Sequence, residues 1–345
     1  MNILKLILTR TTVLAGMIFQ TVGCSSAGKT SDHFDGKRFF NPEGREVGGF
    51  WATARVMYTL ATSDGWVDPP KDAKEHALPE QPKDNRIEVT FVNHASFIIQ
   101  SSDFVILTDP VWSKRASPFN FAGPTRYREP GIKFDSLRRV DIVLVSHNHY
   151  DHMEIATLSK LKKKFDPYFV VAVGDKRHLE DAGITKVQEL DWWEEAKLPA
   201  GISVTFTPAQ HFSSRGLFDR NKSLWGSFML KTHGKQVYFG GDTGYASHFK
   251  QVEAKFGAPD LALLPIGAYE PYWFMGPIHM NPSDAVKAHT DIKSKRSIGM
   301  HFGTFKLTTE PIDQPAKDLA ASLSEKGIAA EQFTVPVEGS TFTLK

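Results

Sequence analysis

The sequence has 345 residues, and its composition lies close to that of ordinary globular proteins. Hydrophobic residues make up 41% and charged residues 23% of the chain, which excludes a wholly disordered, collagen-like or coiled-coil protein. The 41 Lys and Arg residues nearly balance the 39 Asp and Glu residues, so the chain lacks the basic excess that binding to nucleic acid requires. A single cysteine excludes an intrachain disulfide. The length is enough for one large domain with a substantial core.

The first 23 residues have the order of a secretory signal. Lys5 and Arg10 precede an apolar stretch over 13–19, and the small residue Gly23 precedes Cys24. The apolar stretch is too short to span a bilayer, which needs about 20 residues. The residues up to Cys24 resemble a bacterial lipobox, whose cysteine becomes the lipidated first residue of the mature protein. An ordinary cleaved signal with an incidental cysteine is the alternative.

We expect three parts in the chain: a lipoprotein signal peptide over 1–23, a tether and N-terminal extension over 24–86, and a folded domain over 87–345. A protein lipidated at Cys24 would be anchored to a membrane without crossing it. The expected location is the bacterial cell envelope, at the periplasmic face of the outer membrane.

Elements can be predicted in chain order from apolar patterns. A short helix is expected over 50–60. Runs rich in β-branched and aromatic residues predict strands over 87–99, 104–108, 140–146, 168–173, 202–207, 225–230, 236–241, 261–266 and 297–301. Apolar residues at helical spacing predict helices over 155–161, 285–289 and 319–328, with Asn281 as an N-cap before Pro282. This alternation favours an α/β architecture in which helices cover sheets.

Four potential metal ligands fall within six positions directly after the predicted strand 140–146. Residues two apart in an extended segment point the same way, so His147 and His149 can reach one metal ion. Asp151 and His152, on the following turn, face a second. Imidazole and carboxylate suit zinc and other first-row metals, and the lack of thiolates argues against a structural Cys-rich site. A surface cluster of polar residues is the alternative, but the density of ligands favours a metal site.

Three further candidate ligands lie at the ends of later strands. They are His211, Asp242 and His301. Sites in α/β proteins gather at strand ends because the sheet holds the loops rigidly while their side chains converge. Taken singly, His211 or His301 is typical of a buried core histidine, and the glycines around Asp242 are typical of a turn. Their order after the first cluster favours one shared site.

That order, His-x-His-x-Asp-His followed by His, Asp and His, resembles the metallo-β-lactamase superfamily. The resemblance covers most of the chain from about Val89 and implies an αβ/βα sandwich, in which two mixed sheets are flanked by helices and hold a two-metal site at their edges. Five segments resemble, more narrowly, the N-acylphosphatidylethanolamine-hydrolysing phospholipase D family: 146–152, 190–195, 240–245, 265–271 and 301–305. Residues 87–345 would then be a metallo-β-lactamase-fold catalytic domain.

The resemblance also implies residue roles. Two Zn²⁺ ions would be held, one by His147, His149 and His211 and the other by Asp151, His152 and His301, with Asp242 bridging them. His279 would lie near the substrate phosphate. Phe302 follows His301 where the animal enzymes have Trp, which leaves the ligand intact. The N-terminal 86 residues match poorly, so the family's N-terminal membrane contacts are not carried over.

The implied reaction cleaves N-acylphosphatidylethanolamine to phosphatidic acid and N-acylethanolamine. Two divalent metals supply four positive charges, of which the carboxylates of Asp151 and Asp242 cancel two. A bridging hydroxide and one phosphodiester anion would neutralise the rest, and metals lower the pKa of bound water from 15.7 to about 7. We therefore expect the metal-bridging hydroxide to attack phosphorus, with Asp151, Asp242 and His279 as catalytic residues. A structural histidine before a helix cap is the alternative for His279.

Other residues near these motifs have two interpretations each. His94 and Asp109 are either partners that orient metal ligands or, respectively, a buried strand histidine and a turn residue. Tyr269, Trp273 and Phe274 would line a groove for the acyl chains of a phospholipid, but they could equally belong to the core or to a homodimer contact.

Two other functions stay open from the sequence. The same site could hydrolyse another ester, a lactone or a soluble phosphodiester, and it could hold first-row metals other than zinc. The protein could also be a nonenzymatic metal- or lipid-binding envelope lipoprotein.

Overall fold

The structure is a computed structural model that describes residues 31–44, 48–63, 66, 76–119 and 121–344. The predicted signal peptide over 1–23 and the lipidation site Cys24 lie outside the described residues. Contacts divide the chain into two units, Met1–Asp32 and His33–Lys345, and the account below concerns the second. Across the described ranges, no helix has both the length and the apolar character needed to cross a membrane.

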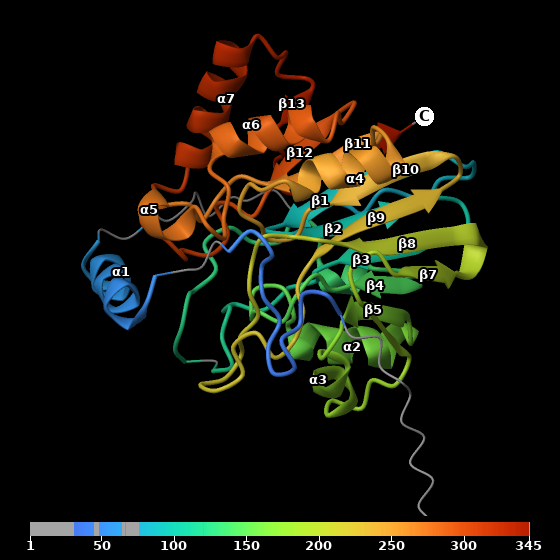
Figure 1. Ribbon diagram of the computed structural model, residues 1–345. Coiled ribbons are helices and arrows are strands. Elements are labelled where there is room, and N and C mark those ends of the chain that lie inside the picture. The colour runs from blue at the N-terminus through green and yellow to red at the C-terminus, as the bar shows by residue number, and fades with distance from the viewer. Residues whose placement is uncertain (1–30, 45–47, 64–65, 67–75, 120, 345) are drawn as a thin grey trace, which may run out of the picture. The chain divides into compact units, whose positions relative to one another are not determined.

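Two mixed sheets form the framework of this unit (Figure 1). The first contains β1 (Ile87–Asn93), β2 (Ser96–Gln100), β3 (Val105–Thr108), β4 (Ile142–Leu144), β5 (Tyr168–Ala172), β6 (Val187–Leu190) and β14 (Thr341–Leu344). The second contains β7 (Glu195–Leu198), β8 (Ile202–Thr207), β9 (Ser227–Thr232), β10 (Lys235–Phe239), β11 (Leu261–Pro265), β12 (Ser297–Met300) and β13 (Phe333–Thr334). The strand orders are β14-β1-β2-β3-β4-β5-β6 and β13-β12-β11-β10-β9-β8-β7.

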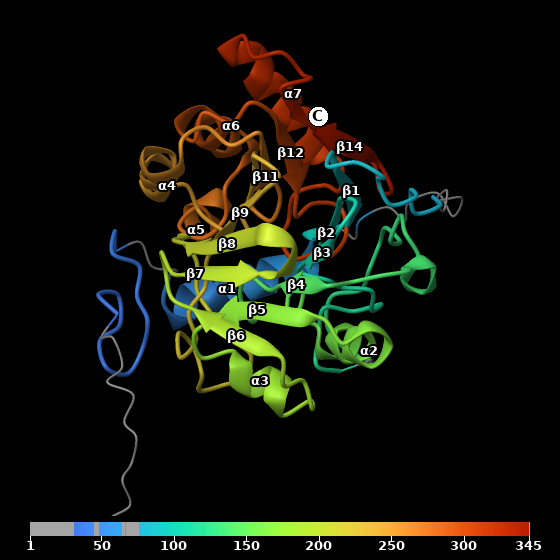
Figure 2. The same cartoon turned by 90° about the vertical axis from the view of Figure 1, so that its right-hand side faces the viewer.

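Helices cover the outer faces of both sheets (Figure 2). The helices are α1 (Phe50–Thr62), α2 (Ile155–Phe165), α3 (Lys176–Glu180), α4 (His248–Phe256), α5 (Tyr272–Met275), α6 (Pro282–Asp291) and α7 (Gln314–Lys326). Apolar side chains of α2 and α3 pack on the first sheet, and those of α4, α6 and α7 pack on the second. The side chain of Asn281 accepts a hydrogen bond from the backbone N–H of Asp284, which confirms the predicted cap of α6. The predicted fold, two mixed sheets flanked by helices, is confirmed.

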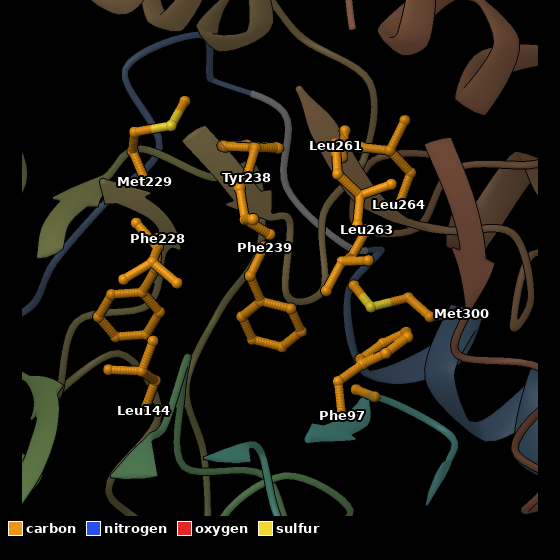
Figure 3. Packing of buried hydrophobic residues seen from close by; sticks show 14 of the residues in the cluster. Phe97, Leu144, Phe228, Met229, Tyr238, Phe239, Leu261, Leu263, Leu264 and Met300 are labelled. Atoms are coloured by element: carbon orange, nitrogen blue, oxygen red, sulfur yellow. The ribbon is translucent and has the colours of Figure 1, made fainter. Parts of the chain in front are cut away.

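The core between the sheets follows from the alternation of side chains along each strand. In β2, Phe97 and Ile99 point into the cluster between the sheets, while Ile98 points outward to the cluster beneath α2 and α3. Figure 3 shows Phe97 and Leu144 of the first sheet facing apolar side chains of the second, such as Phe239. Because both faces of the central strands are covered, strands such as β4 and β11 are apolar throughout.

The prediction of one strand over 87–99 is wrong, because the chain turns back between β1 and β2. His94 occupies the turn with φ of +51°, a conformation that non-glycine residues rarely adopt. Its backbone N–H donates to Thr304 Oγ1, so a partner distant in sequence stabilises a turn that has no Gly or Pro. The short strands β6, β7, β13 and β14 and the helices α3, α4 and α5 were not predicted.

The direction of the strands decides where the loops meet. The strands β3, β4 and β5 run parallel, as do β10, β11 and β12. The carboxyl ends of parallel strands lie at one edge of their sheet, so the residues that follow them share that edge. Asp109 follows β3, His147 follows β4, Asp242 follows β10 and His301 follows β12.

Candidate metal centre

The loop after β4 holds its alternate side chains in opposite directions. His147 Nε2 and His149 Nδ1 lie 2.9 Å apart, while Asn148 between them turns away and donates to Asp175 Oδ1 at 3.0 Å. This is the alternation expected of an extended segment. His149 O then accepts from the backbone N–H of His152 and of Met153, which starts the turn that redirects Asp151 and His152.

The first group of candidate ligands is His147, His149 and His211. His211 Nε2 lies 3.2 Å from His149 Nδ1. The other ring nitrogen of His211 lies 2.9 Å from the carbonyl oxygen of Ile278. Because a carbonyl only accepts, His211 Nδ1 carries the proton and Nε2 presents its lone pair to the group.

The second group is Asp151, His152 and His301. Asp151 Oδ2 lies 3.3 Å from His301 Nε2 and 3.4 Å from His152 Nε2. These atoms therefore converge on one point although His301 is 150 positions away from Asp151 in the sequence. All three residues are buried.

Asp242 lies between the two groups. Its Oδ2 is 3.0 Å from His301 Nε2 and 3.2 Å from His152 Nε2 in one group. The same oxygen is 3.8 Å from His211 Nε2 and 4.0 Å from His147 Nε2 in the other. One carboxylate thus faces both groups, which is the position that a bridging ligand needs.

A glycine allows Asp242 to come this close. Gly241 has φ of +55°, and a Cβ there would lie 2.8 Å from Ser146 Cβ and 2.9 Å from Gly226 O. Both the conformation and the space therefore exclude a side chain at this position. The close approach brings the end of β10 in the second sheet against the metal-binding loop of the first.

The buried carboxylates of the site favour the presence of positive charge beside them. Burial lowers the pKa of His147 and His211 well below the ordinary value, so both rings are neutral. Burial alone would raise the pKa of Asp242, but the positive charge of His152 and His301 lowers it well below its ordinary range. Conversely, burial alone would lower the pKa of His301, and Asp242 raises it to about 9. The buried carboxylates thus draw positive charge into the site, either as protons or as metal ions.

The donor set fits metal ions. The ligand atoms of His147, His149 and His211 lie within 4.8 Å of one another, as do those of Asp151, His152 and His301 together with His94. Imidazole and carboxylate ligands suit zinc and its first-row neighbours. Asp242 Oδ1 is buried and has no hydrogen-bond partner among the described residues. A buried carboxylate oxygen without a partner is costly, and a bound cation would remove that cost. The cluster can therefore bind metal.

Contacts behind the ligands hold their orientation. Asp109 accepts from the backbone N–H and the hydroxyl of Ser146 at 2.7 and 2.6 Å and lies 2.6 Å from His152 Nδ1. His94 Nε2 lies 3.0 Å from Asp151 Oδ2. Both residues contact candidate ligands directly, which favours an orienting role over a plain turn or core role.

The remaining predicted site residues lie at different distances from the centre. His279 is buried, with Nδ1 at 3.9 Å from Asp242 Oδ2, and this nitrogen has no hydrogen-bond partner among the described residues. Tyr269 is buried and its hydroxyl donates to Asp318 Oδ2 at 2.6 Å. Phe274 packs in a cluster with Val56 of α1, whereas Trp273 is 56% exposed. Their catalytic and substrate-binding roles stay predictions.

Sequence reasoning missed two residues that hold the centre in place. Arg215 Nη1 donates to the carbonyls of Asn148 and Met153, on either side of the ligand turn. Asn41 Nδ2 donates at 2.8 Å to the carbonyl of His211 from a segment 170 positions earlier. Arg215 follows the candidate ligand His211 by four positions, and this proximity could have indicated that it lies near the site. No feature of the sequence indicated a role for Asn41.

Comparisons with known proteins agree with this geometry. The model of the family described as "Beta-lactamase superfamily domain" matches residues 105–302. An uncharacterized protein of Mycobacterium tuberculosis is 38% identical over 74% of this chain and 68% of its own length. The N-acyl-phosphatidylethanolamine-hydrolyzing phospholipase D 1 of Caenorhabditis elegans is 38% identical over 67% of this chain and 68% of its own length.

A solved structure shares the fold at lower identity. A metallo hydrolase of the archaeon Ignicoccus hospitalis superposes with a TM-score of 0.57 and 21% identity, over 75% of this chain and 99% of that one. The family match covers more than half of the chain and includes the loop after β4, Asp242 and His301. The chain therefore belongs to the metallo-β-lactamase superfamily, as a metal-dependent hydrolase homologous to the N-acylphosphatidylethanolamine-hydrolysing phospholipases D.

Proposed function

We propose that this hydrolase is a zinc-dependent phospholipase D that cleaves N-acylphosphatidylethanolamine to phosphatidic acid and N-acylethanolamine. The observation that supports this most is the position of Asp242 Oδ2, within 4.0 Å of histidine nitrogens from both ligand groups. Such an arrangement suits two metal ions that share one phosphodiester. The name of the C. elegans relative supplies the substrate class.

In this proposal seven side chains hold two Zn²⁺ ions. His147, His149 and His211 would hold the first ion, Asp151, His152 and His301 would hold the second, and Asp242 lies between the two groups. Bound zinc would supply an activated water and positive charge at the phosphoryl oxygens. Asp109 keeps the Nε2 lone pair of His152 directed at the site by accepting from its Nδ1–H.

His279 is the one predicted catalytic residue that is not a candidate metal ligand, and in this proposal it contacts the substrate. Its buried Nδ1 lies beside Asp242 and is not used by another described group. Burial lowers the pKa of His279 to about 4, so the ring is neutral at pH 7 and one of its nitrogens carries a proton. That N–H can donate to a phosphoryl oxygen or to the ethanolamine oxygen as the P–O bond breaks. Water supplies one proton to the alcohol product and its oxygen to phosphatidic acid.

The direct test is hydrolysis of labelled N-acylphosphatidylethanolamine by the purified full chain, with metal content measured on the same sample. We expect phosphatidic acid as the labelled product and two equivalents of zinc. Cleavage of generic esters without cleavage of the lipid would support a hydrolase of this superfamily and would contradict the phospholipase D activity. Retained metal with no hydrolysis of any ester would overturn the enzymatic proposal.

We also propose that Cys24 anchors the enzyme to the outer membrane of the bacterial envelope, on its periplasmic side. The lipobox-like residues before Cys24 support this. Labelled fatty acid should be incorporated into the wild-type chain and not into Cys24→Ser. Equal labelling of both proteins would contradict the anchor.

A further inference from the structure

Two loops beside the candidate metal centre expose pairs of large apolar side chains at their tips. The loop 213–222, between β8 and β9, presents Leu217 and Phe218 at 92% and 81% exposure. In the loop 113–125, between β3 and β4, the described residues 113–119 and 121–125 present Phe119 and Phe121 at 56% and 76% exposure, with ring centroids 5.5 Å apart. A single exposed apolar residue needs no explanation, but two such pairs near one site indicate a contact surface.

Hydrogen bonds hold the 213–222 loop in a shape that keeps its tip in solvent. Asp219 accepts from the backbone N–H groups of Gly216 and Arg215 at 2.8 and 3.1 Å. Asn221 N donates to Ser213 O at 2.8 Å and closes the base of the loop. The backbone of the loop is thus fixed on both sides of Leu217 and Phe218, which keeps them from folding onto the core.

The 113–125 loop is closed in a similar way. Arg115 and Thr125 form an isolated β-bridge, and Arg115 Nη1 donates to Gly123 O at 2.6 Å. Gly123 has φ of +96°, and a Cβ there would lie 2.6 Å from Ser117 Cβ, so the tight turn requires glycine. The two phenylalanines therefore also project from a defined support.

Both loops are attached to the residues that directly follow the metal-binding turn. Arg215 Nη1 donates to Met153 O at 2.8 Å, and Ser113 N donates to Glu154 Oε2 at 3.1 Å. In Figure 1 both loops extend on the same side of the molecule as α1 and α5. A surface that receives the two tips would consequently lie next to the metal centre.

The charge of the two loops is strongly positive. They contain five basic residues and one acidic residue, Asp219. Arg115 and Arg215 bond to backbone carbonyls of the protein, and the exposed basic side chains are Lys114, Arg220 and Lys222. The carboxylate of Asp219 is already bonded to backbone amides of its own loop. The chain as a whole carries a net charge of only +2, so the two loops are more positive than the chain on average. It complements an anionic surface.

We propose that the loops 113–125 and 213–222 dock this enzyme on a bilayer that contains anionic phospholipid. The apolar tips enter the interfacial region while the basic side chains contact the headgroups. Separate apolar prongs on a basic background suit a deformable lipid surface better than a flat, close-packed protein interface. This inference rests on the proposed function in one respect, because the same bilayer would supply the phospholipid substrate.

A local probe tests the contact independently of any anchor. The full chain is prepared as Cys24→Ser with Leu217→Cys, and the new thiol is labelled with a fluorophore whose emission shifts to the blue in an apolar environment. Vesicles of phosphatidylcholine with phosphatidylglycerol should produce that shift. The matched control is Tyr168→Cys, at a half-exposed aromatic at the start of β5, where no shift is expected. Absence of a shift at position 217 would overturn the proposal.

A second measurement separates docking from catalysis. In the Cys24→Ser chain, replacing both tip residues, Leu217→Ser with Phe218→Ser, should weaken vesicle binding on the order of tenfold, while Tyr168→Ser leaves it unchanged. Turnover of a short, water-soluble phosphodiester should be unaffected by either change. If the wild type binds vesicles through the tips but hydrolyses no phosphodiester, the docking proposal is supported and the proposed phospholipase D function is wrong. If the double variant loses self-association in solution and keeps vesicle affinity, the surface is a contact between copies and the docking proposal is wrong.

Discussion

The first sheet contributes four candidate ligands from a single turn, whereas the second contributes three from three separate strand ends. Residues 147–152 are prearranged by the local chain, since the extended segment and the turn after it already divide them into two sets. His211, Asp242 and His301 reach the same place only because β8, β10 and β12 are correctly placed in one sheet through their pairing with β9 and β11. One half of the site depends on local conformation and the other on sheet assembly.

The largest effect should come from Asp242, where the two halves meet. Asp242→Asn retains the shape but removes the charge that faces both groups. Hydrolysis should fall on the order of 1,000-fold, and the bound metal should fall by at least one equivalent. Asp260→Asn, at the opposite end of the neighbouring strand, is the control and should retain both metals. Full metal content in Asp242→Asn would show that the two halves hold their metals independently.

The second largest effect should come from Asp109, which orients the candidate ligand His152 in the first sheet. Asp109→Asn replaces the acceptor of His152 Nδ1–H with an amide, so metal affinity should fall about 100-fold. Titration with a competing chelator measures this. Asp141→Asn, at the amino end of β4, changes the same sheet away from the centre. An equal loss in both variants would mean that sheet stability, rather than ligand orientation, is responsible.

A smaller effect should appear as pH dependence of stability. Asp175, the partner of Asn148, is fully buried, and this burial raises its pKa from 3.8 to about 7. The unfolded chain releases this proton more readily, so the contribution of Asp175 to stability falls as pH rises from about 4 through 7. Between pH 5 and pH 8 the free energy of unfolding should drop by about 2 kcal/mol in the wild type, and Asp175→Asn should remove this drop. Parallel pH profiles for the two proteins in urea denaturation would contradict it.

The smallest effect should come from Asn41, which supports the second half from the N-terminal segment. Asn41→Ala removes one hydrogen bond to the carbonyl of His211 and should cost about 1 kcal/mol of unfolding free energy. Metal retention against a chelator should decrease slightly. Asp35→Ala changes the same segment but only its internal hydrogen bonds, so metal retention should be unchanged. A loss of metal in Asp35→Ala as large as in Asn41→Ala would mean that the segment acts only through general stability.

Much of the fold was predictable because central strands that are buried on both faces are continuous apolar runs. The strands β3, β5, β8 and β11 were located to within a few residues from their enrichment in β-branched and aromatic residues. The hairpin between β1 and β2 was not, because its turn has no Gly or Pro and His94 adopts a positive φ against Thr304. The edge strands β13 and β14 were missed since they are short and only partly buried.

The sequence by itself determined the chemistry of the candidate centre: imidazole and carboxylate groups at the spacing of a strand end, without thiolates. Ligand type is a property of each side chain, and the alternation of an extended segment is local, so both can be derived without a fold. Only the tertiary structure decided that His211, Asp242 and His301 meet the first cluster, and that Asn41 and Arg215 support it. The meeting of His211, Asp242 and His301 depends on strand pairing across many residues, and the contact of Asn41 joins segments 170 positions apart, so no local pattern of the chain encodes them.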